Sequence, residues 1–432
     1  MTDKIFKFIE KITPARWHQA INHSGYKRYF LNTSWMFGGQ LFSLLISFFV
    51  STWVARYLGP QNYGILSYST AFVGIFSFIS SLGIDGILNR DLINTPEKRD
   101  QLMGTSFYLK LIGGTVAFFV SVISVLIFQS DPLIKLLVIL FSFSFILQSF
   151  NIIGNYFNAE VKAKNNVKTV LFATVISSTL KVFTILLGKG IIWIILIYLL
   201  DVLWQGIGFI VSYNNYGLKI KNWNFDKNLA IKILKNSWPL MFASAASFIY
   251  LKIDQVMIGS ILGNYEVGIY AAAAKLAEVW YFIPGIICTS LFPAIINAKK
   301  TGIDLYRNRL KKLYILMIII SVAMAIPITI LAKPIIYTLF GSGYMESVNI
   351  LRIYIWSSIG LFLSVAIGQY LVTENSVKTI FILNLITMVI NIILNLIFIP
   401  IWGLVGSAFA TLISYFIIPI YVFGIKKIKF YD

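Results

Sequence analysis

Long apolar runs recur along the chain and are separated by short segments in which the charged residues collect. Each run contains about 20 residues or more, which is the length that an α-helix needs to cross a bilayer. Runs such as 44–50 and 315–324 are apolar at every position except one serine each, whereas the strands of a membrane barrel would alternate apolar and polar residues. The pattern therefore predicts an all-α integral membrane protein with about twelve transmembrane helices. The predicted spans are 31–55, 63–88, 104–128, 132–157, 168–188, 190–212, 237–262, 266–295, 312–332, 347–373, 378–399 and 403–425.

An internal repeat of about 203 residues divides the predicted helices into two sets of six. The motif Leu-Gly, four residues, Gly-Ile stands at 58–65 and again at 262–269, both times at the turn between the first two helices of a set. This equivalent placement favours a repeat over chance identity among common apolar residues. Because each set has an even number of helices, both take the same orientation. We therefore expect two six-helix halves around a central cavity that holds the substrate site.

The predicted segments follow from these spans. A cytoplasmic tail (1–30) precedes a six-helix bundle (31–213), a cytoplasmic linker (214–236), a second six-helix bundle (237–425) and a cytoplasmic C-terminal tail (426–432). Apolar residues at helical spacing in 3–12 predict a short amphipathic helix on the membrane surface, with a frayed basic tail as the alternative. In the linker, we expect Asp226 to cap a helix that leads into the seventh span.

The charge distribution indicates topology rather than a nucleic-acid partner. The chain is 58% hydrophobic and 12% charged, with a net charge of +19, whereas soluble domains contain about 25% charged residues. Of the 36 Lys and Arg, six lie within or beside spans and three lie in outer loops (Arg56, Lys189 and Lys333), which leaves 27 on one side. Basic residues collect on the cytoplasmic side of membrane proteins. The pattern therefore predicts that both termini are cytoplasmic.

Several kinds of site are excluded by the residues that the chain lacks. Cys288 is the only cysteine, and the only histidines, His18 and His23, lie in the N-terminal tail. A disulfide within one chain and a His- or Cys-based metal site in the spans are therefore impossible. The sequence also contains no nucleotide-binding motif. We expect no metal or cofactor, no enzymatic activity, and an ion gradient of protons or sodium as the energy source.

Basic residues within the spans are the most informative exception to the apolar pattern. Lys110, Lys181, Lys252, Lys275 and Arg352 fall inside predicted helices, and Lys135 lies near the start of one. A cation at the bilayer centre costs roughly 2.5–3.5 kcal/mol, and such residues usually face a wet cavity and mark a substrate path. The pattern predicts a cavity of positive character and hence a transporter of something anionic.

Several motifs resemble those of one transporter family. The segment Ala55-Arg-Tyr-Leu-Gly-Pro-Gln-Asn-Tyr-Gly64 closely resembles the outer turn of bacterial Wzx-type polysaccharide flippases. The resemblance continues through 254–259, 267–273, Pro284, 291–293 and the last helical hairpin at 394–411. It spans nearly the whole chain, and this family belongs to the multidrug/oligosaccharidyl-lipid/polysaccharide exporter superfamily.

The resemblance implies a function in polysaccharide biosynthesis, such as that of O-antigen. It implies a flippase that moves polyprenyl-diphosphate-linked oligosaccharide repeat units from the inner to the outer leaflet of a bacterial or archaeal cytoplasmic membrane by alternating access. A diphosphate headgroup must pass the low-dielectric core of the membrane. Cations in a central cavity would replace its lost hydration while the polyprenyl tail stays in lipid.

Lys252 and Lys275 are the strongest candidates for binding phosphate. The two lysines are predicted to lie at similar depth in the membrane, on the seventh and eighth helices. Glu278 shares a helical face with Lys275. Asp254 points to a different face from Lys252. Asp254 and Glu278 are candidates for a counter-ion or a coupling site, and the alternative is that these charges only pair to hold helices together.

A second set of charged candidates lies elsewhere in the spans. Lys110 and Lys181 are further cavity cations, and we expect Lys181 to form a structural ion pair with Asp201. Asp85 and Arg90 lie at the inner end of the second helix, and Asp85 and Asp201 are further candidates for a counter-ion or a coupling site. Arg90 is a candidate to meet the incoming diphosphate, although snorkelling to the interface is the more usual behaviour.

Two further groups of candidates concern the outer turn and the sugars. Arg56 ends the first helix and is expected either to gate the outer turn or to cap that helix. The candidates for stacking on sugar rings are Trp280, Tyr281, Tyr250 and Tyr270. The alternative for the aromatic residues is the interfacial belt common in membrane proteins.

Three other functions remain open from the sequence. A multidrug or organic-cation antiporter of the same fold would need an acidic cavity rather than one rich in lysine. A membrane glycosyltransferase or polymerase would show a large outer loop or an acidic catalytic cluster. A flippase for lipid-linked peptidoglycan precursors is mechanistically close, but its family has helices beyond twelve.

Overall fold

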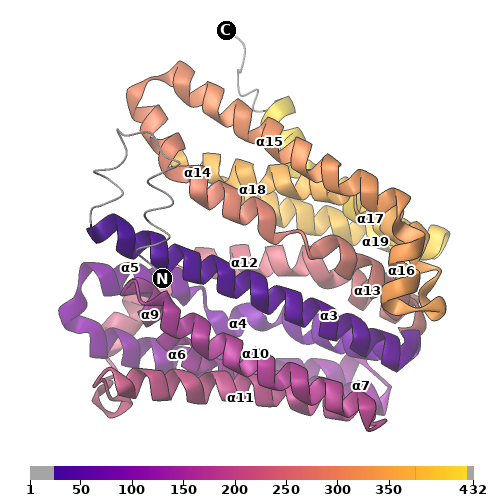
Figure 1. Cartoon of the computed structure of the whole chain (residues 1–432), viewed down its shortest axis with the longest axis horizontal. Helices are drawn as coiled ribbons and strands as arrows, with labels where there is room; N and C mark the ends of the chain where they lie inside the picture. Colours follow the sequence, from indigo (N-terminus) through magenta and orange to yellow (C-terminus); the bar gives the residue numbers. More distant parts are fainter. Residues whose placement is uncertain (1–23, 375, 426–432) are drawn as a thin grey trace.

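The computed structural model describes residues 24–374 and 376–425. The amphipathic helix predicted over 3–12 lies outside these residues. The described part consists of helices joined by turns and short loops and contains no strand, which confirms the predicted all-α class. Figure 1 shows the long helices running roughly along one direction, as membrane-spanning helices do.

The helices up to residue 215 form the first group. They are α3 (Ser24–Ile75), α4 (Ser77–Ser81), α5 (Ile84–Asn94), α6 (Arg99–Phe128), α7 (Pro132–Ser142), α8 (Ser144–Leu147), α9 (Ile152–Ala159), α10 (Ala163–Leu186) and α11 (Ile191–Asn215). Short 3₁₀ turns join some of them: η2 (Pro96–Lys98), η3 (Gln148–Asn151) and η4 (Ile220–Asn222).

The second group begins at residue 227. It comprises α12 (Lys227–Ile261), α13 (Asn264–Glu278), α14 (Phe282–Thr301), α15 (Ile303–Ile330), α16 (Ala332–Phe340), α17 (Ser347–Tyr354), α18 (Ser357–Thr373), α19 (Val377–Tyr415) and α20 (Ile417–Ile420). The 3₁₀ turn η5 (Ser342–Tyr344) and the π-helical turn η6 (Tyr421–Ile425) complete the described chain.

Two glycines account for the number of membrane crossings. Ten helical stretches of the described chain are long and apolar enough to cross a membrane, and two of them have 45 and 47 residues, about twice the length of one crossing. Gly59 (φ 69°) in α3 and Gly403 (φ 59°) in α19 have non-helical backbone angles. Glycine adopts positive φ without steric cost. Each stretch is therefore two crossings joined at a glycine kink, and the ten stretches give the twelve predicted spans.

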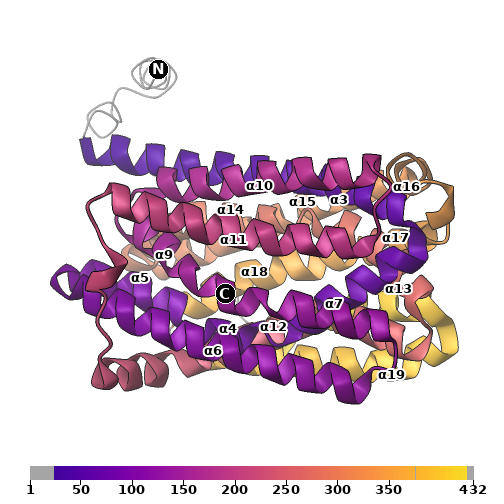
Figure 2. The ribbon, with the colours of Figure 1, turned by 90° about the horizontal axis from the view of Figure 1, so that it is seen from below.

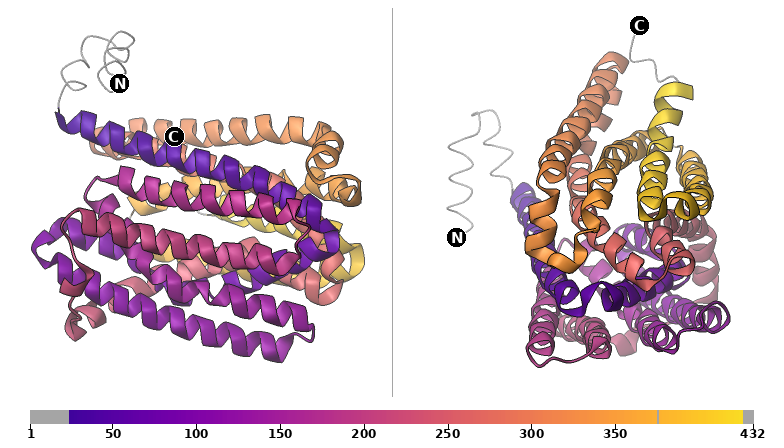
Figure 3. Two further views of the ribbon diagram at one scale, coloured as in Figure 1. Left: turned by 60° about the horizontal axis from the view of Figure 1, so that its bottom comes forward. Right: turned by 90° about the vertical axis from the view of Figure 1, so that its right-hand side faces the viewer.

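Central helices connect the two groups. α3 packs against α10 on one side and against α12 and α13 on another, while α12 also packs against α19. The first group occupies the lower part of Figure 1 and the second group the upper part, with α3, α12 and α13 between them. Figure 2 shows the molecule from below, with α10 and α11 in front. The right-hand view of Figure 3 looks along the helices.

The two copies of the repeated turn meet at one end of the bundle. A Cβ atom on Gly64 would lie 1.6 Å from the carbonyl oxygen of Asn264, and one on Gly268 would lie 1.9 Å from that of Pro60. The backbones of the two turns are therefore in direct contact, which only glycine permits. We call this end of the molecule, which includes α16 and η5 at the right of Figure 1, the Gly59 end.

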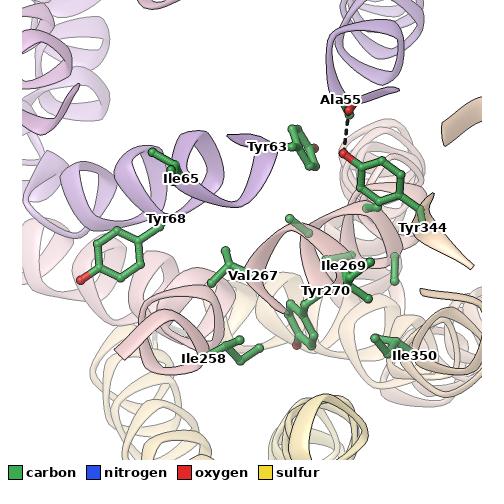
Figure 4. Close-up of a cluster of buried hydrophobic side chains, with 14 of the residues drawn as sticks. Ala55, Tyr63, Ile65, Tyr68, Ile258, Val267, Ile269, Tyr270, Tyr344 and Ile350 are labelled. Atoms are coloured by element: carbon green, nitrogen blue, oxygen red, sulfur yellow. Dashed lines mark hydrogen bonds between the residues drawn. The ribbon is translucent and has the colours of Figure 1, made fainter. Parts of the chain in front are cut away.

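Polar contacts reinforce the packing at the Gly59 end. The Tyr344 hydroxyl donates to the carbonyl oxygen of Ala55 at 2.6 Å, as drawn in Figure 4. Arg56 donates through Nη1 to the carbonyl oxygen of Thr338 at 3.1 Å. The rings of Tyr63 and Tyr344 pack edge to face with centroids 6.2 Å apart. These contacts thus join α3 to α16 and to the turn η5 that follows it.

The structure differs from the expected segments at two places. Asp226 caps α12 as predicted, accepting from the backbone N–H of Leu229 at 2.8 Å, and α12 leads without a break into the predicted seventh span. The last ten residues of the predicted linker therefore belong to a transmembrane helix. The short helix α16 was not predicted, because the apolar run beyond 330 continues past the point where α15 ends.

Candidate functional site

A cavity of about 390 Å³ lies between α3, α12 and α13. Lys252 and Gln255 line it from α12, and Lys275 and Glu278 line it from α13. In both helices the two residues are three apart, so they share a face. The sequence prediction that Lys275 and Glu278 lie on one face is confirmed. Lys252 and Lys275, from neighbouring helices, border the same space.

An adjoining cavity of about 280 Å³ brings in a third lysine. It shares part of its lining with the first cavity and adds Lys181 from α10 and Tyr198 from α11. The shared lining residues are Ser51, Tyr63, Ser67, Thr70 and Lys275. We call the two spaces together the lysine cavity. It is bordered by Lys181, Lys252 and Lys275 and by the hydroxyl groups of α3.

The lysine cavity carries a positive balance of charge. Lys252 donates to Glu278 with an Nζ–Oε2 distance of 2.5 Å, and the Tyr354 hydroxyl donates to the other oxygen of Glu278 at 3.3 Å. Within the described residues, Lys181 and Lys275 form no ion pair within 4.0 Å. Three ammonium groups thus share one carboxylate. Such a space is suited to a ligand that brings negative charge.

The expected ion pair between Lys181 and Asp201 is wrong. Asp201 instead accepts hydrogen bonds from Ser177 at 3.0 Å and from Gln205 at 3.2 Å. Ser177 precedes Lys181 by four residues on α10, so Asp201 lies at the level of the turn before the lysine. Lys181 is left facing the lysine cavity.

The polar residues of α3 were missed by the sequence reasoning. Ser47 and Ser51 line the cavity from one arm of α3, and Tyr63, Ser67 and Thr70 line it from the other. Their spacings of three and four residues place each set on one helical face. That periodicity within an otherwise apolar helix was the signal that identifies them.

A further polar space continues along α3 away from the Gly59 end. It measures about 450 Å³ and is lined by Gln40, Ser43 and Ser47 of α3 together with Asn158 and Asn166. It shares Ser47 and Leu44 with the lysine cavity. Gln40, Ser43, Ser47 and Ser51 are spaced by three and four residues and form a polar stripe. The stripe leads from the lysine cavity toward the first residues of α3.

Asp254 lies in a separate network between α12, α13 and α19. It is 1% exposed and accepts hydrogen bonds from Tyr270 at 2.7 Å, from Asn395 at 2.7 Å and from Thr411. Asn395 in turn accepts from Ser407 at 2.8 Å. Asp254 therefore points away from Lys252 and binds a neighbouring helix, as predicted. Among the described residues no cation lies within 4.0 Å of it.

Lys110 and Asp85 pair with each other rather than with the other candidates. Lys110 donates to Asp85, which also accepts from the Asn155 amide at 2.5 Å. Both line a separate pocket of about 270 Å³. Lys110 does not border the lysine cavity, so its charge is matched locally.

Arg90 and Arg56 lie outside the lysine cavity. The exposed Arg90 binds its neighbour Asp91 at 2.8 Å on the surface. The structure therefore does not bring Arg90 to the three lysines, in keeping with the snorkelling alternative. Arg56 lies at the Gly59 end, where its contact with Thr338 joins α3 to α16.

The four aromatic candidates belong to the packed interior. Tyr250 is buried and packs against Tyr415 with ring centroids 5.6 Å apart. Tyr270 is also buried, and its hydroxyl donates to Asp254. The Tyr281 hydroxyl lies 3.4 Å from that of Ser357, and Trp280 packs against the apolar core. None of the four lines any of the spaces described above. Their faces turn toward other helices, which the sequence pattern does not reveal.

Comparison with known families gives two matches. The family described as "Polysaccharide biosynthesis protein" matches residues 30–299, and the family MatE matches residues 239–397. The first match covers well over half of the chain.

Curated relatives match at moderate identity. The capsular polysaccharide biosynthesis protein CapF of Staphylococcus aureus is 23% identical over 406 residues, which cover 92% of this chain and 99% of that protein. An uncharacterized membrane protein of Methanocaldococcus jannaschii, MJ1375, is 29% identical over 48% of each chain. The probable flippase AglR of Haloferax volcanii is 27% identical over 38% of this chain and 35% of that protein. The chain thus spans about half of MJ1375 and a third of AglR.

Solved structures share the fold. An inward-facing multidrug resistance MATE family transporter of the MOP superfamily superposes with a TM-score of 0.72 at 15% identity, covering 88% of this chain and 93% of that one. The lipid II flippase MurJ in an inward closed conformation gives 0.68 at 19% identity, covering 89% and 86%. At these identities the likeness concerns the arrangement of helices.

Proposed function

The chain belongs to the polysaccharide biosynthesis protein family, and from this premise we propose that it flips polyprenyl-diphosphate-linked oligosaccharide repeat units from the inner to the outer leaflet of a bacterial or archaeal cytoplasmic membrane. The match to a polysaccharide biosynthesis family and the similarity to the probable flippase AglR support this proposal. The observation that carries the proposal is the lysine cavity, in which three lysines share one carboxylate.

The chemistry of the cavity supports a diphosphate as the bound group. A diphosphate that leaves water needs cations and hydrogen-bond donors to replace its hydration, since charges are strongly destabilised in a low-dielectric interior. Lys275 and Lys181 supply unmatched ammonium groups, and the hydroxyls of Ser51, Ser67 and Thr70 supply neutral donors. A cavity for organic cations would have the opposite balance. The same balance argues against a drug antiporter.

The arrangement at the two ends supports a direction of loading. The Gly59 end is held shut by backbone contact between the repeated turns. The polar stripe from Gln40 to Ser51 instead leads from the lysine cavity toward the first residues of α3. The positive-inside pattern assigns that side to the cytoplasm. A substrate assembled on the cytoplasmic face would therefore reach the lysines along this stripe, and opening of the Gly59 end would release it.

The function is tested by translocation in proteoliposomes. Purified protein is given a fluorescent polyprenyl-diphosphate oligosaccharide and, separately, a cationic dye. A lost charged hydrogen bond is worth about 1.5–3 kcal/mol, so Lys252→Gln and Lys275→Gln should each slow glycan-lipid movement roughly tenfold to a hundredfold. Lys135→Gln, a lysine outside the cavity, is the matched control. Wild-type rates in both cavity variants, or transport of the dye in place of the glycan lipid, would refute the proposal.

We further propose that Asp254 is the residue that couples transport to an ion gradient. A buried carboxylate without a cation is costly, and a proton or sodium ion that neutralises it would stabilise the contacts of α12 with α13 and α19. In Asp254→Asn, transport should lose its dependence on an imposed gradient, whereas binding of polyprenyl diphosphate should stay within about twofold because the lysines are unchanged. Asp304→Asn on the surface is the matched control. Full gradient dependence in a stable Asp254→Asn protein would remove Asp254 from the coupling.

A further inference from the structure

The pocket that contains Lys110 and Asp85 has a chemistry different from that of the lysine cavity. It measures about 270 Å³ and lies between helices of the first group and α12. Its two charges are paired with each other. The rest of its polar lining consists of amides and hydroxyls, among them Gln148, Asn151, Ser81 and Ser244. We call it the amide pocket.

The amide pocket suits a neutral ligand rich in hydroxyl groups. Each carboxamide offers both a donor and an acceptor. The hydroxyls of Ser81 and Ser244 donate to the backbone carbonyls of Phe78 and Met241, so they are left to accept a hydrogen bond from a ligand. A phosphate only accepts hydrogen bonds, so it would leave half of these groups unmatched. A sugar hydroxyl donates and accepts, so it can satisfy both kinds. A cation would be repelled by the ammonium group of Lys110, which already pairs with the carboxylate of Asp85.

Two membrane helices break at this pocket. The second crossing is interrupted between α4 and α5, where Leu82 (φ 49°) and Gly83 (φ 64°) have positive φ. The fourth crossing is interrupted by the 3₁₀ turn η3, whose first and last residues are Gln148 and Asn151. Irregular backbone at membrane depth is tolerated where it lines a cavity, and in transporters discontinuous helices commonly form the substrate site.

The amide pocket lies on the same face of α12 as the lysine cavity. Ser244 and Phe248 line the pocket, and Lys252 and Gln255 line the cavity. These four residues are spaced by four, four and three, so they form one stripe along the helix. At about 1.5 Å per residue, Ser244 and Phe248 lie roughly 6–12 Å along the axis from Lys252. A group bonded directly to a diphosphate at Lys252 is thus within reach of the pocket.

We propose that the amide pocket binds the sugars that follow the diphosphate of the lipid-linked substrate, with Phe78 and Phe248 as its apolar lining. This proposal rests on the proposed function, since the lysine cavity supplies the position of the diphosphate. Because the pocket draws on both groups of helices, sugar binding there also ties the groups together. The substrate is then selected at two places, by charge at the lysines and by hydroxyl pattern at the amides.

The test compares two lipids in equilibrium binding to the purified protein in nanodiscs. One is polyprenyl diphosphate, and the other is the same lipid carrying a disaccharide. Gln148→Leu and Ser244→Ala should each weaken binding of the disaccharide lipid by about fivefold, the worth of one hydrogen bond, and leave the bare lipid unchanged. Lys252→Gln should weaken both. Gln129→Leu, outside both spaces, is the matched control, and thermal unfolding checks that each variant is folded.

The outcomes separate the two proposals. Equal affinity of the wild type for both lipids, or equal losses for both lipids in the two pocket variants, would overturn the sugar site and leave the flippase intact. If the wild type binds neither lipid, the proposed function fails and the sugar site fails with it. Selective loss of the disaccharide lipid in either folded pocket variant supports the sugar site.

Discussion

Glu278 is the residue whose charge most directly opposes that of the lysine cavity. It holds Lys252 at 2.5 Å in a partly exposed pair, with side-chain exposures of 28% and 19%. In the proposed function, the phosphate of the substrate competes with this carboxylate for Lys252. The same competition allows the ligand to leave, because Glu278 takes the lysine back.

At this scale we predict the effect of Glu278→Gln. A partly exposed ion pair contributes about 1 kcal/mol. Removing the carboxylate charge that pairs with Lys252 should therefore raise the affinity for polyprenyl diphosphate by about fivefold. Transport should become slower, because release becomes harder. Binding in nanodiscs and translocation in proteoliposomes measure the two quantities. Glu97→Gln on the exposed turn η2 is the control, and unchanged affinity in Glu278→Gln would show that Glu278 does not compete with the ligand.

At the scale of elements, the break between α4 and α5 depends on Gly83. Its φ of 64° disfavours any side chain, and an added Cβ would lie 2.6 Å from the backbone nitrogen of Met241 and 2.8 Å from the carbonyl oxygen of Ser237. Both atoms belong to the backbone of α12 and cannot rotate away. The broken second crossing therefore rests directly on α12.

Gly83→Ala should lower the free energy of unfolding by about 1–3 kcal/mol, from backbone strain and overpacking together. Gly86→Ala, three residues further along α5, meets no atom within 4 Å. Gly86→Ala is the control, and it should leave the free energy of unfolding unchanged or raise it, since alanine favours a helix by up to about 1 kcal/mol over glycine. Thermal unfolding in detergent compares them, and equal stability of the two variants would contradict this account of the break.

At the scale of the whole molecule, we propose that the contact between the repeated turns acts as the gate in the alternating access of the proposed function. Gly64 and Gly268 let the two backbones touch, and a side chain at either position would hold the turns apart. Among the described residues no ion pair joins the two turns, so the contact rests on the fit of the two backbones. Its closure is therefore sensitive to a single methyl group.

Gly268→Ala should shift the population toward a state open at the Gly59 end. In a Cys288→Ser background, a cysteine at the buried cavity residue Ala271 reports this opening to a membrane-impermeant maleimide. Labelling from the outer side should become faster by on the order of tenfold, which corresponds to about 1.4 kcal/mol. Gly285→Ala, which meets no atom within 4 Å, is the control. A labelling rate unaffected by Gly268→Ala would show that this contact is not the gate.

What could be derived from the sequence concerns properties that each helix has by itself. Crossing a bilayer imposes a length and an apolar surface on every span separately, so the twelve spans and their approximate ends could be predicted. The cost of an intramembrane cation is likewise local, so Lys181, Lys252 and Lys275 could be singled out. The shared face of Lys275 and Glu278 follows from helical spacing alone.

What only the tertiary structure decided is which faces meet. Lys252 pairs with Glu278, Asp201 turns to Ser177 rather than to Lys181, and Tyr250 and Tyr270 pack inward instead of facing a cavity. The breaks that shape the amide pocket were also unpredicted, because helical spacing and hydropathy continue across them. In each case the outcome depends on the rotation of one helix against another far away in sequence. The sequence by itself thus determined the spans and their charges, whereas packing between distant helices decided which charges are matched and which are left for a ligand.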